Sequence, residues 1–301
     1  MKQPRITLAL GGGGARGSAH LGVIQAITEA GLTIDRIVGT SIGALMGGAY
    51  AAEPEIEVVQ KRMLDFLMSP EFQKHQDAMF GTRSTPDDQD GGMFGWYDRI
   101  KDYMRATGIF HRVISRTSML PGVLLNEVVS HLIPEIDISE TKIPLGVVSV
   151  DLVSGHQIVL ERGSLQTAIK ASASLPGIFP PVEWGDMLLS DIGVFNSLPA
   201  IVAQSYDNDV VIAVDVSSGL KRQTKFDNAL DVLMRIDEVG ETLYRKHIRS
   251  KADLLIRPAV DGTEWFDFSR APKLIENGLL EGRRAIRKFL AKRESDTNGD
   301  C

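Results

Sequence analysis

The sequence predicts an α/β protein, because buried strand patterns alternate with helical patterns along the chain. Residues 6–10 alternate toward a buried strand, and the apolar spacing of residues 20–30 is helical. A second apolar run at residues 34–38 leads into residues 42–52, a helix built almost wholly of small or apolar residues. In both units a glycine-rich turn connects the strand to its helix, and these turns carry the functional signal.

The second turn, residues 39–43, has the G-x-S-x-G spacing of a nucleophile elbow. Such an elbow holds its serine in a strained conformation, so the positions two before and two after it must be nearly free of side chain. Gly39 and Gly43 meet this need around Ser41, and the helix that follows points its positive end at the serine. We therefore predict that Ser41 is a nucleophile. The alternative is a tight turn in which Ser41 only caps a helix.

The first turn, Gly-Gly-Gly-Gly-Ala-Arg-Gly at residues 11–17, can present the unpaired backbone N–H groups that an acyl-transfer oxyanion needs. Its glycines at 12, 14 and 17 also fit the dinucleotide fingerprint G-x-G-x-x-G. That alternative requires an acidic residue at the end of the second strand, but Asp35 stands at the beginning of that strand. The P-loop pattern is absent, since no Lys-Ser or Lys-Thr follows the glycines.

Two later motifs complete a recognisable set. They are Ala-Ser-Ala-Ser-Leu-Pro-Gly-Ile-Phe-Pro-Pro-Val at residues 171–182 and Leu-Ser-Asp-Ile-Gly at residues 189–193. In this order the four motifs resemble the patatin-like phospholipases, in particular the bacterial branch similar to the catalytic domain of neuropathy target esterase. The resemblance spans most of the chain. It implies a three-layer α/β/α fold with a central, mostly parallel sheet, and a Ser-Asp dyad formed by Ser41 and Asp191.

The resemblance also implies that this chain is a lipid acyl hydrolase, acting on phospholipids, lysophospholipids or simple esters without a cofactor. The family pattern and the usual logic of the elbow assign the oxyanion hole to the N–H groups of Gly12, Gly13 and Gly14, joined by that of Ile42. Gly17 and Arg16 would support the glycine loop. Arg16 either pairs with a carboxylate to brace the loop or holds a substrate phosphate.

Asp191 would act as the base in this mechanism. A carboxylate near its reference pKa of about 3.9 accepts protons poorly at neutral pH, so the mechanism needs a desolvated pocket. Ile42, Ile178, Phe179 and Ile192 are candidates to line that pocket. The family usually has glycine directly after the aspartate, and a β-branched residue there restricts the backbone that aims the carboxylate. Because Ile192 stands where the family usually has glycine, a second interpretation stays open: the protein is a non-catalytic regulator that binds an acyl ligand or a protein partner.

A conventional Ser-His-Asp mechanism is the nearest competing chemistry. It is disfavoured because this elbow follows only one β-α unit, and because the histidines after Ser41 lie in no supporting motif. No His or Cys cluster has the spacing of metal ligands, so no metal site is expected. The histidines concerned are His75, His111, His131, His156 and His247.

Composition predicts one sizeable domain. The chain has 301 residues, of which 43% are hydrophobic and 24% charged, and its net charge of −6 argues against nucleic acid binding. The single cysteine, Cys301, allows no intramolecular disulfide, and no signal peptide or membrane span is evident. We expect a cytoplasmic protein that can contact a membrane transiently and peripherally.

The domain is expected to span residues 1–293, with a mobile loop or lid at 69–95 and a disordered tail at 294–301. The last two expected helices are amphipathic, and their apolar stripes are expected to face the core, with a share available for a homodimer. The remaining expected elements are helices at 96–106, 122–132, 164–172, about 226–251 and 271–292, and strands at 143–150, 156–160, 187–189 and 210–216.

Overall fold

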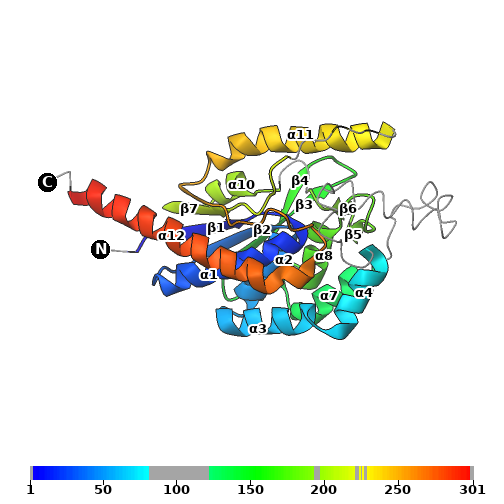
Figure 1. The fold of residues 1–301 in the computed structure, drawn as a ribbon, viewed down its shortest axis with the longest axis horizontal. Helices are drawn as coiled ribbons and strands as arrows, with labels where there is room; N and C mark the ends of the chain where they lie inside the picture. The colour runs from blue at the N-terminus through cyan, green and yellow to red at the C-terminus, as the bar shows by residue number, and fades with distance from the viewer. Residues whose placement is uncertain are drawn as a thin grey trace.

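A mixed sheet runs through the centre of the protein, with helices on both of its faces (Figure 1). The structure, a computed structural model, describes residues 3–80, 122–192, 197–220, 224, 226 and 229–298. Eight strands are present within these ranges: β1 (Ile6–Leu10), β2 (Arg36–Thr40), β3 (Leu145–Asp151), β4 (Gln157–Leu160), β5 (Val182–Trp184), β6 (Met187–Ser190), β7 (Val210–Val214) and β8 (Leu254–Ile256).

The sheet has a parallel part and an antiparallel edge. Hydrogen bonds link the strands along the path β5-β6-β3-β2-β1-β7-β8, in which β6 and β2 pair with different residues of β3, and β4 also pairs with β3. The five strands from β3 to β8 in this order run parallel to one another. Both β4 and β6 run antiparallel to β3, and β5 runs antiparallel to β6. The prediction of a central, mostly parallel sheet is confirmed.

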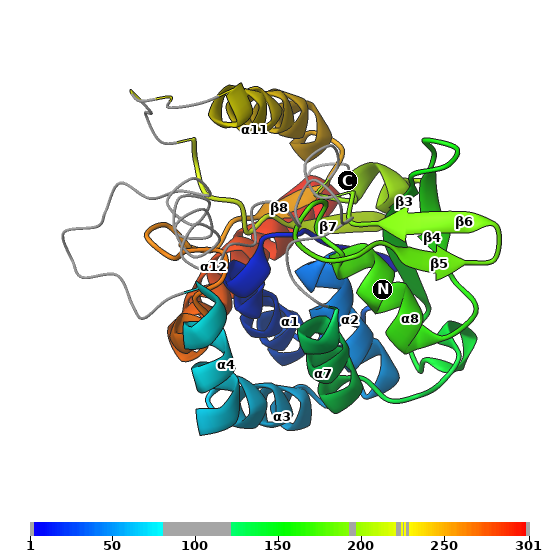
Figure 2. The same ribbon diagram turned by 90° about the vertical axis from the view of Figure 1, so that its right-hand side faces the viewer.

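Helices form a thick layer on one face and a thinner layer on the other (Figures 1 and 2). The thick layer contains α1 (Ala19–Glu29), α2 (Ile42–Ala52), α3 (Ile56–Leu67), α4 (Pro70–Phe80), α7 (Val123–Leu132), α8 (Leu165–Ala173) and α12 (Ala271–Asn298). On the opposite face lie α10 (Ala200–Gln204) and α11 (Ala229–Arg249). Three short 3₁₀ helices, η1 (Gly14–Ser18), η2 (Ile138–Glu140) and η3 (Phe268–Arg270), connect these elements.

Strand alternation divides the core into two clusters. Leu8, Leu10 and Ile37 point into the larger cluster, while Ala9 and Val38 point into the smaller one. Because successive side chains of a strand face opposite sides, the central strands are apolar on both faces. The three-layer α/β/α architecture therefore follows directly from the apolar runs of β1 and β2.

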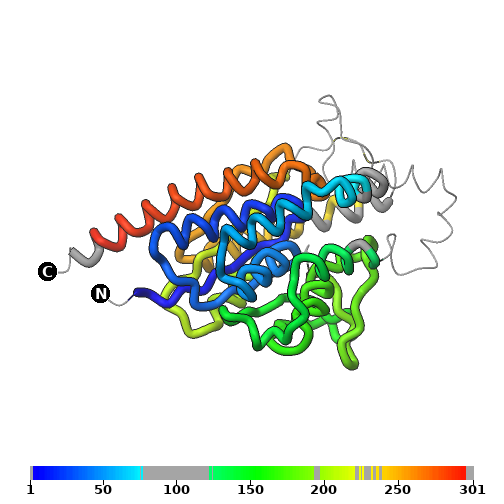
Figure 3. The backbone as a smooth tube through the Cα atoms, turned by 90° about the horizontal axis from the view of Figure 1, so that it is seen from below, coloured from blue at the N-terminus to red at the C-terminus, as the bar shows by residue number. Residues whose placement is uncertain are grey.

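The last helix, α12, packs along the length of α1, the first α-helix (Figure 3). Two glycines allow this approach. A Cβ added to Gly22 would lie 1.9 Å from the carbonyl oxygen of Ile275, and one added to Gly278 would lie 2.0 Å from that of Ala19. The two backbones are therefore in contact, and the last helix holds the first β-α unit in place.

The structure corrects two expectations and leaves others untested. Part of the segment expected to be an irregular loop or lid, residues 70–80, forms helix α4. The tail expected to be disordered from residue 294 is helical as far as Asn298, because α12 continues to that residue. The rest of the proposed lid and the helix expected at 96–106 lie outside the described residues. Among the described residues, no helix is long and apolar enough to cross a bilayer.

We predict that Gly278→Ala lowers the free energy of unfolding by about 1–3 kcal/mol, since the new methyl group forces α12 away from α1. Gly240 is the matched control, because it is also helical but has no atom within 4 Å of an added Cβ. Gly240→Ala should stabilise by about 0.5–1 kcal/mol through helix propensity alone. Urea denaturation measures both, and equal effects would contradict the proposed backbone contact.

Candidate active site

Ser41 occupies a strained turn between β2 and α2. Its backbone dihedral angles are φ 56° and ψ −125°, and it is the only non-glycine residue with a positive φ in the described part of the chain. A Cβ on Gly39 would lie 2.6 Å from the nitrogen of Ala44, and one on Gly43 would lie 2.2 Å from the carbonyl oxygen of Leu10. The elbow thus requires both glycines, as the sequence predicted.

The glycine loop lies directly against this turn. A Cβ on Gly12 would be 3.3 Å from the Cβ of Ser41. The N–H of Gly12 donates to the carbonyl oxygen of Ser197 at 2.7 Å, so in this arrangement it is already occupied. The N–H groups of Gly13, Gly14 and Ile42, in contrast, have no acceptor among the described residues. Three of the four donors predicted for the oxyanion hole therefore lack an acceptor among the described residues, and of the loop glycines it is Gly12 that lies against Ser41.

Strand pairing brings Asp191 to the same place. Thr40, the last residue of β2, pairs with Val148, and Ser190, the last residue of β6, pairs with Val150. Both β2 and β6 lie on one edge of β3, because β4 occupies the other edge from Val147 to Val150. Their carboxyl ends therefore face each other, about 7 Å apart along β3. Ser41 and Asp191 are the next residues of the two strands.

The carboxyl end of α8 holds both of these residues. The hydroxyl of Ser172 accepts the N–H of Ser41 at 2.8 Å and donates to the carbonyl oxygen of Val148 at 2.6 Å. Two residues later, the carbonyl oxygen of Ser174 accepts the N–H of Asp191 at 2.9 Å. Ser41 and Asp191 are 7% and 2% exposed. Both are therefore fixed by backbone hydrogen bonds and shielded from water.

The four apolar residues expected around the site are all buried but do not share one cluster. Ile42 belongs to the larger core cluster and Ile192 to the smaller one, on the opposite face of the sheet. The backbone of Ile192 does not have a positive φ. A β-branched residue is therefore accommodated after Asp191 without the conformation that only glycine adopts readily. Ile178 and Phe179 are 5% and 7% exposed.

Ser197 links the glycine loop to a buried charge network. While its carbonyl oxygen accepts the N–H of Gly12, its hydroxyl donates to Glu241 at 2.7 Å and accepts from Arg245 at 2.7 Å. Arg245 also pairs with Glu241 and lies 3.8 Å from Asp215. Asp215, which is 3% exposed, accepts a hydrogen bond from Nε of Arg249 at 2.6 Å. The network fixes the loop from behind.

Charge pairing in this network keeps its members ionised. Burial lowers the pKa of Arg245 to about 10, although Asp215 opposes the shift, so the guanidinium remains charged at neutral pH. Burial alone would raise the pKa of Asp215, but the charge on Arg245, hydrogen bonds from Ser217 and the charge on Arg249 lower it below 3.8. The ion pairs therefore persist over the whole neutral pH range.

Arg16 braces the loop to which it belongs. Its Nε donates to the carbonyl oxygen of Gly13 at 3.1 Å, and its Nη1 donates to the hydroxyl of Ser218. Gly17, one residue on, leaves room for Ile42, because an added Cβ would lie 2.3 Å from Cγ2 of that side chain. The support roles expected of Arg16 and Gly17 have a clear geometric basis.

His20 lies beneath the glycine loop and was not among the predicted residues. It is completely buried, and its Nε2 lies 2.7 Å from the carbonyl oxygen of Gly11. Burial lowers the pKa of His20 to about 4, against smaller opposing effects of the bond to Gly11 and the charge on Asp215. A neutral imidazole that donates from Nε2 therefore holds the first residue of the loop.

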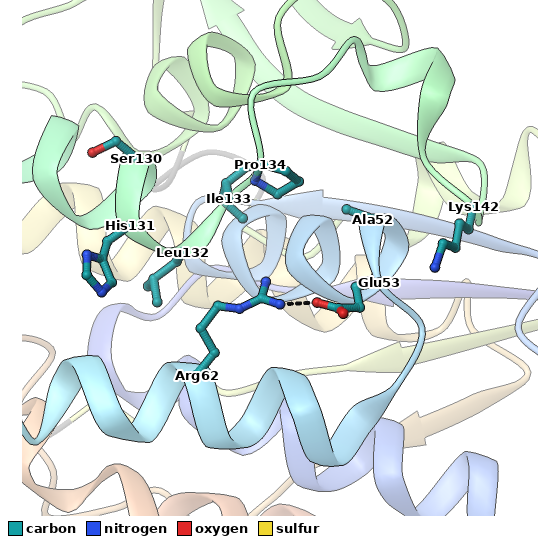
Figure 4. Close-up of a pocket in the computed structure, with 9 residues that line it drawn as sticks. All are labelled: Ala52, Glu53, Arg62, Ser130, His131, Leu132, Ile133, Pro134 and Lys142. Atoms are coloured by element: carbon teal, nitrogen blue, oxygen red, sulfur yellow. Dashed lines mark hydrogen bonds and ion pairs between the residues drawn. The ribbon is translucent and has the colours of Figure 1, made fainter.

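The histidines considered for a Ser-His-Asp mechanism either lie away from Ser41 or have side chains that the structure does not describe. His156 and His247 are exposed, and His131 stacks on Phe66 with ring centroids 4.6 Å apart. His131 also lines a hollow of about 420 Å³ at the far end of α2, where Arg62 and Glu53 are paired (Figure 4). Since α2 has 11 residues, this hollow is about 16 Å from Ser41.

Three residues that the sequence did not single out support the site: Ser172, Ser197 and Arg245. The motif at residues 171–182 contains Ser172, but nothing in the sequence indicates which serine bonds to Ser41. Ser197 and Arg245 are 48 residues apart and meet only through the packing of α11. Helical spacing does place Glu241 and Arg245 on one face, and that is the single local signal of the network.

These features define the class of α/β proteins whose site is built around a serine. Helices cover both faces of the sheet, the serine stands in a strained elbow, and a glycine loop packs against it. The comparison with known families agrees with this class. Residues 8–203 match the model of the patatin-like phospholipases, which is more than half of the chain. The chain belongs to the patatin-like phospholipase family.

Curated relatives include longer proteins. An uncharacterised NTE family protein of Mycobacterium tuberculosis is 29% identical over 307 residues, covering 93% of this chain and 46% of the relative. Patatin-like phospholipase domain-containing protein 7 of Mus musculus is 32% identical, covering 92% of this chain and 20% of the relative. The chain thus spans about half or less of the relatives it matches. Among solved structures, VipD from Legionella pneumophila aligns with a TM-score of 0.45 and 15% identity, covering 97% of this chain and 67% of VipD.

We predict that Ser172→Ala destabilises the protein by about 1–3 kcal/mol, because the buried N–H of Ser41 and the carbonyl of Val148 both lose a partner. The control is Ser130→Ala in α7, where an exposed hydroxyl donates to the carbonyl oxygen of Glu127. That change should alter stability by less than about 0.5 kcal/mol. Thermal denaturation of both variants measures the difference in stability. A Ser172→Ala protein as stable as wild type would contradict the stabilising role of these two hydrogen bonds.

Stability should fall on acidification because of His20. Its folded pKa of about 4 lies below the unfolded value of 6.5, so the unfolded chain binds the proton first. This contribution is constant above pH 6.5 and is lost between pH 6.5 and 4, by about 3 kcal/mol. His20→Gln keeps a donor but does not titrate, so its unfolding free energy should fall less over this range. If the unfolding free energies of the two proteins changed with pH in parallel, the prediction would be contradicted.

Proposed function

We propose that this chain is a serine acyl hydrolase that cleaves lipid esters, with Ser41 as nucleophile and Asp191 as base. The observation that carries the proposal is the meeting of two strand ends. The carboxyl ends of β2 and β6 face each other along one edge of β3 and present Ser41 and Asp191 at the same point. A strained backbone at the serine is also the geometry expected of a nucleophile at an elbow.

In the first step, Oγ of Ser41 attacks the ester carbonyl carbon and its proton passes to the carboxylate of Asp191. The carbonyl oxygen becomes an oxyanion. The N–H groups of Gly13, Gly14 and Ile42 support the proposal as donors, because they lack acceptors among the described residues. Gly12 would contribute its backbone to the loop rather than a donor, since Ser197 takes its N–H. The amino end of α2 adds a favourable dipole.

Collapse of this intermediate breaks the bond to the alcohol, which leaves with the proton held by Asp191. The acyl group remains on Ser41. A water molecule, deprotonated by Asp191, then attacks the acyl-enzyme, and Ser41 regains its proton as the fatty acid leaves. The burial of both residues supports this sequence, because a low-dielectric site strengthens the interaction between a carboxylate and a developing charge. No cofactor takes part in the proposed steps.

The family supports lipids as the substrate class. The matching model describes phospholipases, so phospholipid or lysophospholipid esters are the substrates we propose, within the carboxylic ester hydrolases. The interpretation as a regulator without activity has one original basis, the residue Ile192. Its ordinary backbone conformation weakens that basis.

We predict that wild-type protein hydrolyses p-nitrophenyl esters and forms a fluorophosphonate adduct at Ser41, whereas Ser41→Ala and Asp191→Asn each lower kcat by about a thousandfold or more. Asp253→Asn is the matched control for the aspartate, because Asp253 only caps the N–H of Val211 at the far side of the sheet. It should retain the wild-type rate. Intact mass spectrometry and initial rates measure these outcomes.

Two results would decide against the proposal. An adduct on a serine other than Ser41 would assign the nucleophile elsewhere. Absence of both turnover and adduct, with detergent micelles present and each variant shown to be folded, would favour a regulator that binds acyl ligands or a protein partner.

A further inference from the structure

Helix α11 turns three of its charged residues inward and several of its apolar residues outward. Arg245 is buried, and Glu241 and Arg249 are partly buried on the side that faces the sheet. On the opposite side Val232, Ile236 and Leu243 are 47%, 67% and 62% exposed. The expectation that the apolar stripe of this helix faces the core is therefore wrong for these residues, although Ile248 of the same helix is buried in the smaller core cluster. The inward-facing charged side chains of α11 belong to the buried network around Asp215, so the apolar side chains on the other side of the helix lie on the surface.

The outward apolar residues form one stripe, in which Val239 is partly buried. Val232, Ile236, Val239 and Leu243 follow each other at steps of four, three and four residues, the spacing of a single helix face. Tyr244, also exposed, flanks them. The helix lies on the outside of the molecule, across the sheet from α1 and α12 (Figures 1 and 2). An apolar face of about three turns on the surface of a protein indicates a binding surface.

The charges at this face select its occupant. Lys246 and His247 are exposed beside the stripe, and Lys251 follows the end of the helix. The one acidic side chain described in α11, Glu241, is turned inward to Ser197 and Arg245. The described outer face is therefore apolar, with Lys246 and His247 at its rim, and this combination complements a surface with an apolar interior and anionic phosphates.

We propose that the outer face of α11 docks onto the surface of a phospholipid assembly. The stripe would lie at the boundary between headgroups and acyl chains, and the basic rim would lie among the phosphates. The choice of lipid as the occupant rests on the proposed function.

The inner side of the same helix is linked to the site. Arg245 and Glu241 hold the hydroxyl of Ser197, whose carbonyl oxygen accepts the N–H of Gly12. Gly12 in turn lies against Ser41. Docking through α11 would therefore hold the glycine loop at a fixed distance from the lipid surface, equal to the thickness of one helix.

Flotation with vesicles tests the proposal. Wild-type protein should float with vesicles of phosphatidylcholine that contain phosphatidylglycerol. Replacing two stripe residues, Ile236→Glu with Leu243→Glu, should weaken binding by about tenfold or more. Leu280→Glu is the matched control, because Leu280 is an apolar residue that is 56% exposed on α12, away from the stripe. This control should bind as wild type does. Lys246→Gln should weaken binding to the anionic vesicles and leave binding to pure phosphatidylcholine unchanged.

Further readouts separate docking from catalysis. The stripe variant should hydrolyse a soluble p-nitrophenyl ester at the wild-type rate, and Ser41→Ala should still bind vesicles. Loss of hydrolysis with intact flotation would defeat the proposed function and leave docking in place. Failure of the wild type to float, or equal flotation of the stripe variant, would overturn the docking proposal even with full esterase activity. A wild-type dimer that the stripe variant converts to monomer, without vesicle binding, would assign the face to self-association instead.

Discussion

Close backbone contact at the carboxyl ends of β1 and β2 is the constraint on which the rest of the structure depends. The first turn of α2 sits against the end of β1, where a Cβ on Gly43 would meet the carbonyl oxygen of Leu10. The glycine loop then fits over the elbow, with Gly12 against Ser41 and Gly17 against Ile42. Any side chain at these positions would separate the two turns. Their contact brings the backbone of the glycine loop against the elbow serine.

A second set of interactions keeps that contact from relaxing. The N–H of Gly11 donates to the carbonyl oxygen of Val214, and the N–H of Gly12 donates to that of Ser197. Asp215 follows Val214 directly and is surrounded by arginine side chains. The loop is therefore fastened to a strand end that is itself held by buried charges. Buried ion pairs contribute little net stability, but they are well suited to fixing one geometry.

The same charges explain the unusual orientation of α11. An amphipathic helix normally buries its apolar stripe, but here Arg245 must reach Asp215 and Ser197 beside the glycine loop. Turning the charged side inward leaves the stripe on the surface. Support of the site therefore exposes apolar residues to water, and the proposed docking onto a lipid surface would remove the cost of that exposure.

The sequence alone predicted the α/β class, the two β-α units, the elbow at Ser41 and the resemblance that singles out Asp191, because each depends on local spacing or on glycine at a defined position. Tertiary structure decided the rest. Ser172 and Ser197 became supports of the site only through contacts between distant segments, and pairing with Asp215 turned Arg245 and Arg249 of α11 inward. His20 became one through its complete burial beneath the loop. Helical periodicity shows that one face of a helix is apolar. Which face turns inward depends on the partners that the fold supplies.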